Sequence, residues 1–194
     1  MTPIQSSSHP APLAPAAAAL GAPADLQRLV LTGFMGAGKS TIGRLLAKRL
    51  GWDFLDLDAH LEQRTGSTIP EIFAQQGEAR FRRLESTALA SALTRKNTVI
   101  ALGGGTPESL TNRLLLEQTP ATLTVFLDAP FPTLFDRCVL QDIARPVLSD
   151  PDAAQTRFAQ RRPHYIRLAS HTVNTTDLTP EETVTALLSA LNKI

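Results

Sequence analysis

The sequence predicts an α/β fold in which a five-stranded parallel sheet carries helices on both faces. Five apolar runs are predicted to be strands, at residues 28–32, 53–57, 98–102, 122–127 and 171–174. Helical patterns separate most of these runs, and strands that alternate with helices assemble into a parallel sheet. Ligands bind such sheets beyond the carboxyl ends of the strands, so the residues after each strand are the first candidates for a site.

A phosphate-binding loop follows the first strand. After the apolar residues 29–32 comes Gly33-Phe34-Met35-Gly36-Ala37-Gly38-Lys39-Ser40, which matches G-x-x-x-x-G-K-[ST]. A helical pattern comes next and stops at Gly51. The glycines turn backbone N–H groups toward phosphate oxygens, Lys39 adds a cation, and Ser40 offers a hydroxyl to Mg²⁺. Because strand, loop and helix occur in the required order, the sequence predicts a nucleoside triphosphate site; a glycine-rich turn without ligand is the alternative.

Two carboxylates follow the second strand. Asp56 and Asp58 are two residues apart, so in an extended strand their side chains point to the same side. Beside a phosphate-binding loop they suit Mg²⁺ coordination and contact with substrate hydroxyl groups. The structural alternative is that Asp58 caps the next helix.

Three glycines, Gly103-Gly104-Gly105, follow the third strand. They offer N–H groups without side-chain obstruction, which favours close approach of a ligand over a plain turn. Helix starts are predicted at Thr106-Pro107, where proline takes the first helical position, and at two sequences with capping-box spacing. These two are Thr68-Ile69-Pro70-Glu71 and Thr179-Pro180-Glu181-Glu182.

Arginine side chains are the candidates for holding an anion, because guanidinium groups bind carboxylate and phosphate through paired, planar hydrogen bonds. They occur in three segments: Phe81-Arg82-Arg83, Arg145-Pro146 and Arg161-Arg162-Pro163. Where two arginines are adjacent, composition leaves open which one binds and which faces water. Trp52, Tyr165 and Cys138 are predicted to be packing residues.

Composition indicates one soluble domain over residues 26–194. The 194 residues carry a formal net charge of +1, so no overall field favours nucleic acid or membrane. No apolar run reaches about 18 residues, so no membrane span is predicted. The single cysteine, Cys138, fits a reducing cytoplasm. Residues 1–25 are rich in Pro, Ala and Ser, with no Lys, Arg, Asp or Glu before Asp25, which predicts a disordered tail.

These motifs together resemble those of shikimate kinases, from about residue 28 to the end of the chain. The elements occur in the family's order: residues 33–44, Phe54-Leu55-Asp56-Leu57-Asp58, residues 69–73, Gly77-Glu78, Phe81-Arg82 with Glu85, Gly103-Gly104-Gly105 and Arg145-Pro146-Val147-Leu148. The resemblance implies the nucleoside-monophosphate-kinase-like P-loop fold, with a lid at about 139–152. It also implies transfer of the ATP γ-phosphoryl group to the 3-hydroxyl of shikimate, in the route to chorismate and the aromatic amino acids.

The resemblance further implies roles for individual residues. Asp58 would hydrogen-bond the shikimate hydroxyls, Arg82 and Arg161 would hold its carboxylate, and Gly104 would contact its ring. Mg²⁺ would be bound by Ser40 directly and by Asp56 through water. The catalytic residues would be Lys39, Asp58 and Arg145, and ATP would be bound by Gly36, Ala37, Gly38, Lys39, Ser40, Thr41 and Arg145.

The sequence departs from the family's pattern in three places. The loop at residues 174–178 lacks the basic residue often found near the adenine, which leaves backbone groups or Arg137 for that contact. The lid sequence at 141–148 is unusual, and Thr106-Pro107 is expected to alter the pocket wall.

Two alternative functions remain open. A related small-molecule kinase, such as a gluconate kinase, would keep the P-loop without needing the two carboxylate-binding arginines. A non-catalytic kinase-like sensor is disfavoured because Lys39, Ser40, Asp56, Asp58 and Arg145 are all present. Beyond ATP and shikimate no partner is expected, and a monomer is the default.

Overall fold

The computed structural model describes residues 25–140 and 150–191 and contains the predicted sheet. Its five strands run in the order β2-β3-β1-β4-β5, and every pairing between them is parallel. The strands are β1 (Arg28–Thr32), β2 (Asp53–Asp56), β3 (Thr98–Ala101), β4 (Thr122–Asp128) and β5 (His171–Asn174). Each lies within one residue of its predicted bounds. The one difference that matters is at β2, because Leu57 begins a helix instead of ending the strand.

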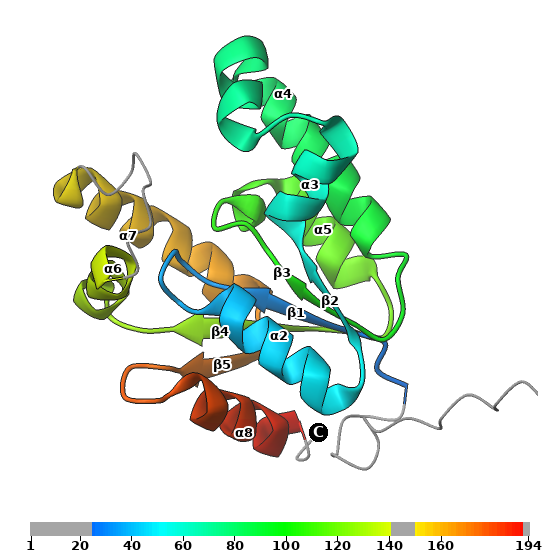
Figure 1. Ribbon diagram of the computed structural model, residues 1–194, viewed down its shortest axis with the longest axis vertical. Coiled ribbons are helices and arrows are strands. Elements are labelled where there is room, and N and C mark those ends of the chain that lie inside the picture. The colour runs from blue at the N-terminus through cyan, green and yellow to red at the C-terminus, as the bar shows by residue number, and fades with distance from the viewer. Residues whose placement is uncertain (1–24, 141–149, 192–194) are drawn as a thin grey trace, which may run out of the picture.

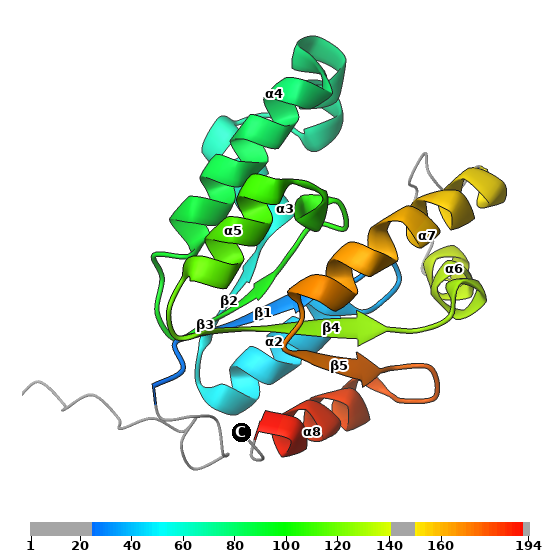
Figure 2. The same ribbon diagram turned by 180° about the vertical axis from the view of Figure 1, so that it is seen from behind.

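Helices cover both faces of the sheet, as predicted. In Figure 1, α2 and α8 lie on the near face, and Figure 2 shows α5 and α7 on the opposite face. The helices are α2 (Lys39–Leu50), α3 (Leu57–Thr65), α4 (Ile69–Ala92), α5 (Leu110–Gln118), α6 (Phe131–Leu140), α7 (Pro151–Leu168) and α8 (Pro180–Leu191), with a short 3-10 helix η1 (Thr106–Glu108).

The central strand β1 explains why both faces are covered. All five of its residues are buried, and successive side chains point to opposite faces. Leu29 and Leu31 belong to a core that includes residues of α2 and α8, whereas Val30 belongs to a second core with residues of α4, α5 and α7. A strand that is apolar on both sides requires a helical layer on each side.

Local sequence sets the ends of several helices. The hydroxyl of Thr68 and the carboxylate of Glu71 form the predicted capping box at the start of α4, and Thr179 and Glu182 form the same reciprocal bonds at α8. Gly51 ends α2 in the left-handed conformation, with φ 66°. Pro107 is the second residue of η1, which begins at Thr106 and is separate from α5.

Some expectations lie wholly or partly outside the described residues. Residues 1–24 of the predicted tail lie outside them, and so does most of the lid predicted at 139–152, including Arg145. The edges of that segment are helical: Val139 and Leu140 end α6, and Asp150 caps α7. Within residues 25–140 and 150–191, no helix is both long and apolar enough to cross a membrane.

Candidate functional site

The phosphate-binding loop lies between β1 and α2 and has the backbone that its glycines predict. Gly36 and Gly38 have φ of 77° and 83°, which side chains disfavour. The N-cap of α2 is Gly38, which has no side chain that could accept a hydrogen bond from the N–H groups of the first turn. The ammonium of Lys39 donates to the carbonyls of Gly33 and Phe34 at 2.8 and 2.9 Å. Positive charge and the N–H groups of a helix N-terminus, which have no partner within the helix, therefore meet at one place, the arrangement that binds phosphate.

The hydroxyl and carboxylate predicted to serve a metal are in direct contact. Ser40 donates from Oγ to Oδ2 of Asp56 at 2.6 Å. The other carboxylate oxygen of Asp56 accepts the backbone N–H of Asp58 at 3.2 Å and so caps α3. The helix-capping role, considered for Asp58 from the sequence, therefore belongs to Asp56. Asp58 lies in the first turn of α3.

Asp56 and Asp58 reach one cavity for a different reason from the one the sequence suggested. The strand-alternation argument is wrong, because β2 ends at Asp56 and α3 follows directly. The tight strand-to-helix junction nevertheless leaves both carboxylates on a cavity of about 240 Å³. Its lining also includes Gly36, Gly38, Lys39, Ser40, Thr41, Gly103 and Gly104. Ala37 is buried and lines the second cavity, described below.

The glycine run after β3 joins this cavity to the arginines. A Cβ atom on Gly103 would lie 2.6 Å from Oδ1 of Asp58, and one on Gly105 would lie 2.8 and 3.0 Å from guanidinium nitrogens of Arg82 and Arg161. Only glycine leaves these side chains room. The run therefore forms a floor with a carboxylate at one end and two arginines at the other.

Arg82 on α4 and Arg161 on α7 are brought together, as the resemblance implies. Both donate from Nη2 to the same oxygen, Oε2 of Glu108, at 3.0 Å. Their sequence neighbours point elsewhere: Arg83 is exposed, and Arg162 pairs with Asp128 at 2.6 Å. Burial lowers the pKa of Arg82, but the negative charges of Glu85 and Glu108 outweigh it, so that pKa is raised and the guanidinium stays charged.

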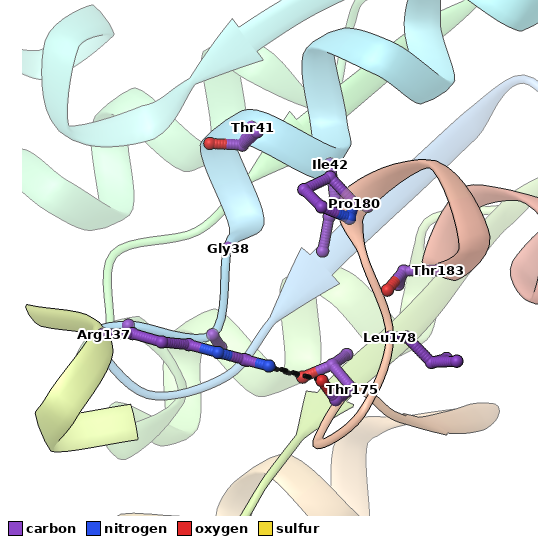
Figure 3. Close-up of a pocket in the computed structure, with 10 residues that line it drawn as sticks. Gly38, Thr41, Ile42, Arg137, Thr175, Leu178, Pro180 and Thr183 are labelled. Atoms are coloured by element: carbon purple, nitrogen blue, oxygen red, sulfur yellow. Dashed lines mark hydrogen bonds between the residues drawn. The ribbon is translucent and has the colours of Figure 1, made fainter. Parts of the chain in front are cut away.

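A second cavity, of about 230 Å³, lies on the other side of the phosphate-binding loop (Figure 3). Arg137 of α6 reaches across it and donates to Oγ1 of Thr175 at 3.1 Å and to the carbonyl of Thr176 at 3.1 Å. Ile42, Leu178 and Pro180 supply apolar walls. Since residues 174–178 contain no basic side chain, Arg137 is the cation of this cavity.

The comparisons with known proteins agree with this geometry. The family model for shikimate kinase matches residues 35–192. The chain belongs to the shikimate kinase family. A shikimate kinase of Thermobifida fusca (strain YX) is 44% identical over 159 residues, which is 79% of this chain and 88% of that protein. One from Xanthomonas campestris pv. campestris (strain 8004) is 40% identical over 84% of this chain and 91% of its own length.

Solved structures of shikimate kinases are also similar to this chain. A shikimate kinase from Acinetobacter baumannii in complex with shikimate superposes with a TM-score of 0.81 at 33% identity, over 91% of this chain and 97% of that one. A gluconokinase from Sinorhizobium meliloti 1021 has a TM-score of 0.55 at 18% identity, which shows a shared fold alone. These neighbours confirm the P-loop kinase fold and the shikimate kinase resemblance.

Three residues that contact the predicted site residues were not themselves predicted as site residues. Glu85 is buried and holds Arg82 at 3.1 Å while it accepts from Thr106 at 2.8 Å. Tyr165 is buried as a packing residue, as predicted, but its hydroxyl also donates to the carbonyl of Gly104 at 2.5 Å. Glu108 bridges the arginines. Only Glu85 carried a signal: it was among the motif residues of the family resemblance, and it lies three residues after Arg82, at helical spacing.

Proposed function

We propose that this protein is a shikimate kinase that transfers the γ-phosphoryl group of ATP to the 3-hydroxyl of shikimate. One observation carries the proposal: the glycine run connects the phosphate-binding loop to Arg82 and Arg161. These two arginines already bind one carboxylate oxygen, Oε2 of Glu108, which is 3.0 Å from Nη2 of each. A small acid seated on this run would place its carboxylate at Arg82 and Arg161 and its hydroxyl groups at Asp58. Gly104, between them, would face the ring.

ATP would bind along the loop and the start of α2. The helix dipole and the N–H groups from Gly36 to Thr41 favour the phosphates, and Lys39 would leave its loop carbonyls to meet them. The adenine would enter the cavity of Figure 3, where Arg137 and the backbone at Thr175 supply polar contacts. Arg145 is proposed to reach the phosphates from the lid, but it lies outside the described residues.

The residues beside the loop fit Mg²⁺. Within the described ranges no cluster of three or more His, Cys, Asp or Glu side chains could hold a metal. Mg²⁺ does not need one, since it is commonly held by one or two protein oxygens together with water and substrate phosphates. Ser40 would be a direct ligand and Asp56, hydrogen-bonded to it, would act through water. When bound, the ion would neutralise charge on the phosphate oxygens.

Asp58 is proposed to orient the attacking hydroxyl and to accept its proton. It is the carboxylate that faces Gly103 at the end of the floor nearest the loop. Phosphoryl transfer depends mainly on positioning and on stabilising charge, and Lys39 and Asp58, which line the same cavity, would supply both. We expect the reaction to occur in the cytoplasm, with a monomer as the working unit.

A substrate comparison tests the proposal against the gluconate alternative. Coupled ADP release should be measured with shikimate, with gluconate and with neither. We expect release that depends on shikimate and no more than background with gluconate. Faster turnover of gluconate would contradict the proposal, and equal background with both acids would favour the non-catalytic alternative.

A further inference from the structure

A carboxylate of the chain itself lies where the carboxylate of the substrate is proposed to bind. Oε2 of Glu108 is 3.0 Å from Nη2 of Arg82 and 3.0 Å from Nη2 of Arg161. The position of a Cβ on Gly105 would be 2.8 Å from the same oxygen. Glu108 therefore closes the arginine end of the glycine floor.

The backbone of Glu108 is fixed while its side chain is not enclosed. Arg113 donates to the carbonyls of Pro107 and Glu108 at 2.6 and 2.9 Å, and Asn112 donates to the carbonyl of Thr106 at 3.0 Å. These bonds hold η1 in place at the end of the floor. The side chain of Glu108 is 34% exposed, so a rotamer change would release its carboxylate to water.

The other carboxylates on Arg82 cannot play the same part. Glu85 is held on its second oxygen by Thr106, and its side chain is only 2% exposed, so it stays in place. Glu78 lies one helical turn before Arg82, and its Oε1 is 3.2 Å from Nη2 of Arg82. Among the described residues it makes no ion pair with Arg161. Glu108 alone among the described residues spans both arginines.

Charge favours the departure of Glu108 when an acid arrives. Two guanidinium groups face three carboxylates, so the cluster already has one negative charge in excess. A substrate carboxylate would add another, and like charges at such distances repel. Glu108 also leaves Arg161 incompletely satisfied, because the buried Nε of Arg161 has no acceptor among the described residues.

We propose that Glu108 is an internal competitor for the substrate carboxylate: it occupies Arg82 and Arg161 in the empty site and is displaced when the acid binds. This inference rests on the proposed role of those arginines in holding shikimate. Its consequence is selectivity. A ligand that brings a carboxylate replaces one ion pair with another, whereas a neutral ligand of the same shape leaves Glu108 in place and meets it at the end of the floor.

Glu108→Gln tests the competition with little change of shape. Calorimetry should compare binding of shikimate and of its neutral carboxamide to the wild type, to Glu108→Gln and to the control Glu117→Gln. Glu117 is exposed on α5 and makes no ion pair with either arginine, so its variant matches the change in net charge. We expect Glu108→Gln to bind shikimate about 3- to 5-fold more tightly, the effect of a partly exposed ion pair. The carboxamide affinity should change less than 2-fold, and Glu117→Gln should match the wild type for both ligands.

A double-mutant cycle that combines Glu108→Gln with Arg161→Ala tests this inference separately from the proposed role of Arg161 in holding shikimate. We expect Arg161→Ala to weaken shikimate binding and to reduce the gain from Glu108→Gln, because Glu108 then keeps only its ion pair with Arg82. If Arg161→Ala weakens binding but Glu108→Gln leaves it unchanged or weaker, Glu108 is not a competitor and the inference fails alone. If Arg161→Ala does not affect shikimate binding, the proposed carboxylate site is wrong and the inference fails with it. Glu108→Ala provides the same comparison should the glutamine variant fold poorly.

Discussion

Removal of one oxygen atom from Tyr165 should weaken shikimate binding without disturbing the ATP site. The ring is fully buried and packs against Phe126 with centroids 5.3 Å apart. Its hydroxyl donates to the carbonyl of Gly104, 61 residues away in the sequence. Tyr165→Phe keeps the packing and deletes this bond, which positions the middle glycine of the floor.

The expected size follows from the surroundings of the bond. A typical hydrogen bond contributes about 0.5–1.5 kcal/mol to folding, and more when its loss leaves a buried group unsatisfied. Gly104 is partly exposed, so water can replace the hydroxyl, and a loss of about 1 kcal/mol in the free energy of unfolding is expected. For a protein of this length that is a fall in Tm of about 2–4 °C. The same energy lost from substrate positioning corresponds to a rise of about 5-fold in the KM for shikimate.

Steady-state kinetics with each substrate varied in turn measure the effect. The KM for shikimate should rise in Tyr165→Phe while the KM for ATP stays within 2-fold of the wild type. Phe126→Leu is the matched control, because it weakens the same packing contact and leaves the hydroxyl bond to Gly104. If Tyr165→Phe loses stability but keeps the wild-type KM for shikimate, the bond does not position a substrate-contacting glycine.

Four further expectations concern the same site. Lys39→Ala should lower kcat about 10²-fold or more, and near wild-type kcat would refute its assignment. Asp58→Asn should keep its fold and lose most of kcat; normal turnover would remove it from the proton-transfer step. Arg82→Ala and Arg161→Ala should weaken shikimate binding and spare ATP binding in calorimetry, whereas Arg162→Ala, which loses only its partner Asp128, should spare both. Burial raises the pKa of Tyr165 above its unfolded value, so the Tm should fall as pH rises past about 10, and fall more in the wild type than in Tyr165→Phe; the same fall in Tm with pH in both proteins would contradict this.

The parts of the fold that depend on local sequence could be predicted. Strand bounds followed from apolar runs, and the ends of α2 and α4 followed from Gly51 and from the capping box at Thr68. The phosphate-binding loop was recognisable because one short segment carries all its residue types. In each case the interacting groups are close in the sequence, so their spacing determines the contact.

The arginine end of the site could not be derived from the residues alone. Arg82 and Arg161 meet Glu108 across 26 and 53 residues, and only the packing of α4 and α7 around the glycine run brings them together. Which of Arg82 and Arg83 faces the site depends on how α4 is rotated about its axis when it packs. Composition left that choice open, and the family resemblance supplied it. The geometry of Asp58 was misjudged because helix α3 begins one residue earlier than the apolar pattern suggested.

The central claim is that this chain phosphorylates shikimate on the glycine floor between the P-loop and the arginine pair. Its most direct test is the formation of ADP by the full chain with ATP and Mg²⁺, in the presence and absence of shikimate, with the product identified by phosphorus NMR. We expect ADP and a phosphate ester at the 3-hydroxyl to form in equal amounts, and only when shikimate is present. ADP formation that is independent of shikimate, or an ester at another hydroxyl, would contradict the proposed arrangement of Asp58, Arg82 and Arg161.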